Sequence, residues 1–113
     1  MNFSIEYLDQ IVIFKLKCAN VDSDISARLK AELLILCQPD IQALVMDFSG
    51  VEYIDSSGLG ALLLAHRQLR DHSIPIFLCG VQESIFHLFD MLNLQDLFEF
   101  YPTLEEAIEA VNK

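Results

Sequence analysis

Residues 45–70 read "VMDFSGVEYIDSSGLGALLLAHRQLR", and this stretch decides how the chain is expected to fold. It opens inside the apolar run 41–48, which predicts a strand covered on both faces. Residues 49–55 predict a loop, and residues 57–71 repeat apolar side chains at the spacing of a helix. A buried strand followed closely by a helix is typical of an α/β protein with a parallel sheet.

The rest of the chain continues this alternation of strands and helices. Residues 3–9 and 11–17 predict a hairpin, because both alternate along the chain and only a short turn separates them. Further strands are predicted at 41–48, 73–80 and 97–100. Helices are predicted from Asp22, Ser23 or Asp24 to about Cys37, and at 57–71, 81–94 and 103–113. The predicted fold is α/β, with a mixed, mostly parallel β-sheet started by an N-terminal hairpin and about four helices packed on it.

The apolar residues of each predicted helix share one face, which is expected to pack on the sheet. In chain order these faces are Ile25, Leu29, Leu33 and Leu36; Ala61, Leu62, Ala65 and Leu69; Ile85, Leu88, Phe89 and Leu92; and Leu104, Ala107, Ile108 and Val111. Leu34 and Ile35 lie outside the first face, so the second half of that helix is expected to be covered on more than one side. Thr103 and Glu106 predict a capping box for the last helix.

The composition excludes several classes of function. The 113 residues predict one domain, 1–113, and the net charge of −10 argues against binding to nucleic acid, which needs a basic surface. An acidic surface suits a partner with a basic face. No apolar run is long enough to cross a bilayer and no secretory signal is present, so a cytoplasmic protein without membrane insertion is expected. Cys18, Cys37 and Cys79 lack metal-ligand spacing, which predicts reduced core side chains and no metal site.

The polar residues before the second long helix form the candidate functional site. Asp55, Ser56 and Ser57 lie between a strand's carboxyl end and a helix, where open α/β sheets place functional groups. A helix N-terminus favours an anion, including one attached to a serine, and Gly58 lets the backbone approach such a group. Ser56, with Asp55, is expected to cap the helix, which leaves Ser57 exposed. The carboxylates Asp22, Asp24 and Glu52 are candidates for the same end of the sheet.

A catalytic serine is the weaker interpretation of this motif. A nucleophilic serine needs a base within hydrogen-bond reach, and His66 lies more than two helical turns beyond Ser57. A nucleophile elbow needs glycine two residues before the serine, where this chain has Ile54 or Asp55. The sequence therefore predicts that the protein is not an enzyme and that Ser57 is a target of modification.

The same helix carries a second candidate surface, the α-helical stripe Leu59, Leu63, His66 and Arg70 with Arg67 beside it. A mixture of leucine and basic side chains is typical of a protein-docking face. The alternative is a broad core face with ordinary charged residues at its rim.

Three parts of the chain carry a family resemblance: residues 45–70, the N-terminal hairpin and the segment "FHLFDMLNLQDLFEFYPTLEEAIEAV". They closely resemble STAS domains, in particular the single-domain anti-sigma-factor antagonists of bacteria. The resemblance covers essentially the whole chain. It implies that Ser57, the second serine of D-S-S-G, is phosphorylated by an anti-sigma factor that is itself a serine kinase, with Ser56 left as the alternative by geometry alone. The unphosphorylated protein would bind this kinase and release the sigma factor, and a serine phosphatase would restore it. The kinase binds the ATP, so no cofactor is expected here.

The resemblance also places acidic positions beside the phosphoacceptor, at Asp22 and Asp55. Where the family often has Gly-Glu-Leu-Asp, this chain reads "CANVD", so Ala19 and Asn20 are expected to dock a different partner surface. The alternative function is a STAS scaffold or accessory subunit that is not phosphorylated, in a stress-signalling complex or lipid transport. The expected partner-binding residues are Asp22, Asp24, Asp55, Ser56, Ser57, Gly58, Leu59, Leu63, His66, Arg67 and Arg70.

Overall fold

The computed structural model describes residues 2–113 and contains a five-stranded sheet with the order β1-β2-β4-β6-β7. Strands β1 (Phe3–Leu8) and β2 (Ile11–Leu16) form the predicted antiparallel hairpin. Strands β4 (Ala43–Asp47), β6 (Ile76–Cys79) and β7 (Glu99–Tyr101) continue the sheet in parallel with β2. The predicted fold class, a mixed and mostly parallel sheet that starts with a hairpin, is confirmed.

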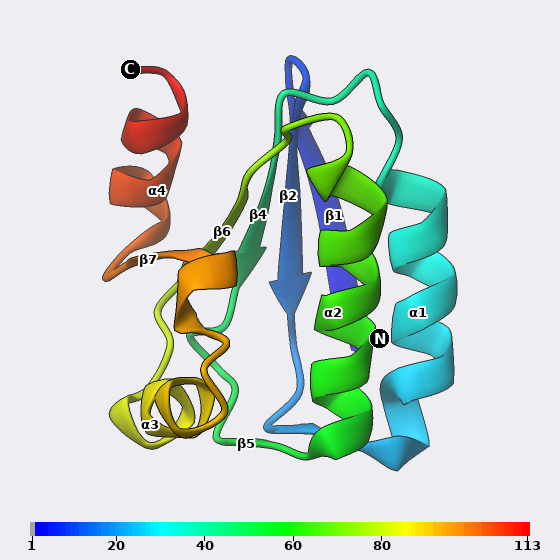
Figure 1. The fold of residues 1–113 in the computed structure, drawn as a ribbon, viewed down its shortest axis with the longest axis vertical. Coiled ribbons are helices and arrows are strands. Elements are labelled where there is room, and N and C mark those ends of the chain that lie inside the picture. The colour runs from blue at the N-terminus through cyan, green and yellow to red at the C-terminus, as the bar shows by residue number, and fades with distance from the viewer. Residues whose placement is uncertain (1) are drawn as a thin grey trace.

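Four helices cover the two faces of this sheet. Helices α1 (Ser23–Leu36) and α2 (Ser56–Arg70) pack side by side on one face, and α3 (Glu83–Met91) adds to the same core. Helix α4 (Leu104–Val111) lies on the opposite face, as Figure 1 shows. A single 3₁₀ turn, η1 (Gln95–Leu97), connects α3 to β7.

The sheet separates two hydrophobic cores, which explains why β6 and all of β4 except its last residue, Asp47, are apolar. Alternate residues of a strand point to opposite faces. In the larger core, under α1, α2 and α3, the sheet contributes Val12, Phe14, Leu44, Met46 and Leu78. In the smaller core, under α4, it contributes Ile11, Ile13, Ala43, Val45, Phe77 and Cys79. Because both faces are covered, no polar alternation is required in β4 or β6.

Two short strands were not predicted. Strands β3 (Asn20–Val21) and β5 (Tyr53–Ile54) pair in parallel and form a second, two-stranded sheet in segments that the sequence assigns to loops. A strand of two residues is too short to show alternation, so only its pairing defines it. Helix α2 also begins one residue before the predicted Ser57, because Asp55 is its N-cap.

Two predictions about the helix faces are wrong. Leu34 and Ile35 are 47% and 68% exposed, so the second half of α1 is not covered on more than one side. Leu92 is also exposed, and it lies one residue beyond the end of α3 at Met91. The remaining residues of the four predicted faces are buried or packed against a core. Cys37 and Cys79 are buried, Cys18 is half-buried, and all three thiols are free.

Candidate functional site

The short β3–β5 sheet brings the N-termini of α1 and α2 together. Val21 pairs with Ile54, and the next residue on each strand, Asp22 or Asp55, is the N-cap of the helix that follows. Both helices therefore begin at the same end of the molecule, where the ribbon of β5 leads into α2 at the bottom of Figure 1. The structure thus brings Asp22, Asp24, Asp55, Ser56 and Ser57 to one end, as the sequence predicts.

The two serines differ in their contacts. One carboxylate oxygen of Asp55, Oδ1, accepts hydrogen bonds from the Gly58 backbone N–H at 3.0 Å and from the Ser57 hydroxyl at 2.6 Å. The prediction that Ser57 is the exposed serine is wrong, because Ser57 is half-buried, whereas Ser56 is exposed. The prediction that Ser56 helps to cap α2 is wrong, because Asp55 alone supplies the capping oxygen and Ser57 donates to it.

These hydrogen bonds lower the pKa of Asp55 below its ordinary value. The Ser57 hydroxyl makes the largest contribution, and the backbone N–H of Gly58 the next. Burial raises this pKa in part, and the backbone N–H groups of Ser57 and of Ser23 make smaller contributions that lower it. A carboxylate with a lowered pKa is a weak base, so Asp55 is poorly suited to remove the Ser57 proton.

The lowered pKa of Asp55 predicts how acid affects stability. A carboxylate whose pKa is lowered by folding stabilises the protein above its unfolded pKa, and this contribution is lost as the pH falls through the folded value. From about pH 4 downward, the wild type should therefore lose stability more steeply than Asp55→Asn, which keeps a capping side chain without a titrating group. Urea unfolding between neutral and acidic pH would measure both slopes, and parallel slopes would contradict the assignment.

Gly58 and Leu59 do not belong to an exposed docking surface, contrary to the prediction. Both residues are buried. A Cβ at position 58 would overlap the Val21 carbonyl oxygen, so glycine is required there for close packing of α2 on β3. Leu59 is part of the larger core.

The predicted stripe on α2 is also less continuous than the sequence suggests. Leu63 and His66 are half-buried, and the His66 ring packs edge-on against Phe98 at a centroid distance of 6.1 Å. Burial lowers the pKa of His66, and Arg70 lowers it further. Arg67 and Arg70 are exposed, but Arg70 lies about 20 Å along the helix axis from Ser57. The basic end of the stripe is therefore separate from the serines.

Sequence reasoning did not identify Tyr53 as part of this end of the molecule. Tyr53 lies in β5, two residues before the N-cap Asp55, and is 54% exposed. Exposed aromatic side chains are common anchors in protein interfaces. The sequence predicts a loop at residues 49–55, which gives no reason to expect that Tyr53 points outward.

The fold and the motif at the start of α2 agree with one protein family. The protein-family model of the STAS domain matches residues 2–107, so the chain belongs to the STAS domain family. Within the family it is 31% identical over 103 residues to the anti-sigma-B factor antagonist of Listeria monocytogenes. The alignment covers 88% of this chain and 89% of that protein.

Solved structures show the same fold at lower sequence identity. An anti-sigma-factor antagonist (STAS) domain protein from Planctomyces limnophilus has a TM-score of 0.89 and 16% identity, with 98% of each chain covered. The anti-sigma factor antagonist SpoIIAA in its unphosphorylated form has a TM-score of 0.78 and 21% identity, with 97% of each chain covered. The Bacillus protein SpoIIAA has also been solved in the phosphorylated form, with a TM-score of 0.76, 22% identity and coverage of 96% of this chain and 98% of that one. Among the described residues, no helix has the length and apolar character needed to span a membrane.

Proposed function

We propose that the protein is an anti-sigma-factor antagonist that is switched by phosphorylation of Ser57. In the unphosphorylated form it binds an anti-sigma factor that is also a serine kinase, and the sigma factor is released. The kinase transfers phosphate from its own ATP to Ser57, which ends the interaction, and a serine phosphatase restores the binding form. The name of the Listeria relative supports the partner, and the two solved forms of SpoIIAA support a phosphorylation switch.

The position of the Ser57 hydroxyl is the observation that carries this proposal. Ser57 is half-buried in the first turn of a helix of 15 residues, and its hydroxyl donates to Asp55 at 2.6 Å. Asp55 is a weak base, and His66 on the same helix is about 13 Å further along the axis. A hydroxyl at the start of a helix without a base to activate it suits the substrate of a kinase better than a nucleophile.

A phosphoryl group at Ser57 should act on binding more than on folding. It replaces the hydrogen that Ser57 donates to Asp55 and adds a charge of about −1.5 to −2 beside that carboxylate. The positive end of α2 compensates part of this charge, so the fold is expected to persist. Asp22 and Asp24 lie at the same end, and Glu52 directly precedes β5 there, so a partner that fits the neutral hydroxyl would meet a more negative surface.

The test uses ATP and the candidate serine kinases of the same genome, with the phosphosite mapped by mass spectrometry. We expect phosphate on Ser57 in the wild type and in the matched variant Ser56→Ala, and none on Ser57→Ala. Ser57→Ala should keep its unfolding temperature and bind the kinase, while Ser57→Asp should bind about tenfold more weakly, a difference of roughly 1.4 kcal/mol.

Two results would contradict the proposal. Phosphate found only on other residues would exclude Ser57 as the acceptor. No phosphate with any candidate kinase, together with equal binding of Ser57→Ala and Ser57→Asp, would favour a scaffold or accessory subunit instead.

A further inference from the structure

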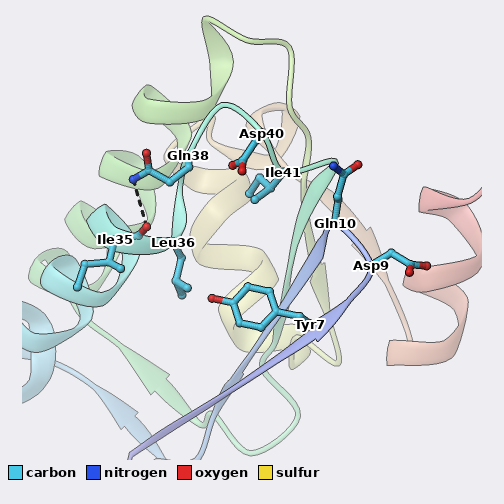
Figure 2. Close-up of a pocket in the computed structure, with 8 residues that line it drawn as sticks. All are labelled: Tyr7, Asp9, Gln10, Ile35, Leu36, Gln38, Asp40 and Ile41. Atoms are coloured by element: carbon cyan, nitrogen blue, oxygen red, sulfur yellow. Dashed lines mark hydrogen bonds between the residues drawn. The ribbon is translucent and has the colours of Figure 1, made fainter.

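A cavity of about 270 Å³ lies at the opposite end of the sheet from Ser57. It opens between the tip of the β1–β2 hairpin and the C-terminal end of α1, and Figure 2 shows the side chains that line it. The hairpin contributes Tyr7 and Asp9, and the end of α1 with the loop after it contributes Ile35, Gln38, Asp40 and Ile41. These residues meet only through the fold, because about 25 residues of chain separate the two groups.

Part of the cavity wall is apolar and open to solvent. Tyr7 and Ile35 are 65% and 68% exposed, the latter on the outer side of α1. Tyr7 pairs with Val12, so its side chain lies on the face of β1 that packs under α1. In Figure 2 the Tyr7 ring reaches from β1 toward the end of that helix. The Tyr7 ring and the Ile35 side chain both border the cavity. An extended side chain from another molecule could cover these two apolar surfaces.

The charges around the cavity are negative. Asp9 and Asp40 both line it, no Lys or Arg does, and neither carboxylate is in a salt bridge with another residue in the range 2–113. The last turn of α1 contains no basic residue, so its negative dipole end is not offset by a cation. The amide of Gln38 donates instead to the carbonyl oxygens of Leu34 and Ile35, at 3.2 and 3.1 Å, which satisfies these groups without adding charge.

From this combination we propose that the cavity is a second docking site, which takes an arginine side chain of a partner protein. The guanidinium would stack on the Tyr7 ring and pair with Asp40, while its methylene groups contact Ile35 and Ile41. Arginine fits better than lysine, because its planar group stacks on an aromatic ring and forms paired hydrogen bonds with a carboxylate. A second copy of this chain is the poorer occupant, since each copy carries a net charge of −10 and two copies repel.

This docking site is independent of the proposed phosphorylation switch. Helix α1 has 14 residues, so its length of about 20 Å separates the cavity from the Asp22 end. Charges are screened over about 8 Å at physiological ionic strength, and a phosphoryl group at Ser57 should therefore have little effect on the cavity. A partner bound there can stay bound while Ser57 is phosphorylated and dephosphorylated.

The test is an NMR titration of the full chain with N-acetyl-arginine amide. Backbone shifts should concentrate at Tyr7, Asp9, Gln38 and Asp40 and saturate. N-acetyl-citrulline amide, which has nearly the same shape without the charge, should cause no saturating shifts. The lysine analogue should bind about two- to fivefold more weakly than the arginine compound.

Variants then distinguish binding of the arginine compound in the cavity from non-specific attraction of a cation to an acidic protein. Tyr7→Ala and Asp40→Asn should each weaken binding by about two- to fivefold. The matched controls are Tyr53→Ala, an exposed tyrosine at the other end, and Glu109→Gln on α4, and both should bind as the wild type does, as should Ser57→Asp. Unfolding curves verify that each variant is folded. Shifts spread over the glutamates of α4, equal binding of the citrulline analogue, or unchanged binding by Asp40→Asn and Tyr7→Ala would each overturn the proposal.

Discussion

Replacing Gly58 by alanine is expected to destabilise the protein by about 3 kcal/mol, although alanine is the better helix former. The added Cβ would overlap the carbonyl oxygen of Val21 and lie 2.8 Å from Cγ1 of Ile54. The Val21 oxygen cannot easily retreat, because it accepts the backbone N–H of Asp55 at 3.1 Å. Any relief of the overlap therefore moves β3 away from the start of α2 and disturbs the cap at Asp55.

Gly60→Ala is the matched control for this prediction. Gly60 is in the same helix, and a Cβ at that position would meet no atom within 4 Å. Alanine there should leave stability unchanged or raise it by up to about 1 kcal/mol, since glycine is unfavourable inside a helix. Urea unfolding of both variants measures the difference. If Gly58→Ala is as stable as Gly60→Ala, the close contact between α2 and β3 does not exist in solution.

The second large effect is expected for Phe89→Ala, at about 4 kcal/mol. Phe89 is completely buried on α3, and its ring meets those of Phe98 and Phe100 at centroid distances of 5.7 and 5.6 Å. Both pairs are nearly perpendicular, at 77° and 87°, which is a favourable arrangement for aromatic rings. The three rings join α3 to β7 and its preceding residue, so truncation of Phe89 leaves a cavity at the centre of that junction.

Phe86→Ala provides the comparison on the same helix. Phe86 is 38% exposed and its ring contacts Phe100 at 4.9 Å, so the same truncation opens a site that water can partly fill. Its expected cost is about 1–2 kcal/mol. Thermal and urea unfolding should rank the two variants in this order. Equal losses of stability in the two variants would contradict the difference in burial between Phe89 and Phe86.

Sequence pattern predicted β1, β2, β4 and β6 well because these strands are long enough to carry a signal, whereas β7 has three residues and lies at Glu99–Tyr101 instead of the predicted 97–100. The apolar run in β4 identifies a strand covered on both faces. The alternation in β2 identifies a strand of a hairpin. Asp9 closes that hairpin with a φ of 54°, a conformation that aspartate tolerates without the usual glycine. Strands β3 and β5 could not be found in this way, because each consists of two residues that are defined by a partner 33 positions away.

The candidate site was predicted only in part, because sequence pattern does not reveal which distant segments pack against each other. Residue type and the family resemblance are enough to select Asp22, Asp55 and Ser57. Helical rotation alone placed Leu59 on an exposed stripe, because rotation does not reveal that β3 and β5 lie against the first turn of α2. The cavity beside Tyr7 was not predicted either, since its walls come from a hairpin and a helix end that only the folded sheet brings together.

The order of the sheet has a consequence for the synthesis of the protein. In the main sheet each strand pairs with the main-sheet strand made before it, so β2, β4, β6 and β7 can join in the order in which they leave the ribosome. Helix α4 follows all of them in the chain, yet it alone covers the face formed by Ile11, Ile13, Val45 and Phe77. A nascent chain that has completed its sheet but not α4 therefore presents this apolar face to water, and is open to chaperones and to aggregation until the helix arrives.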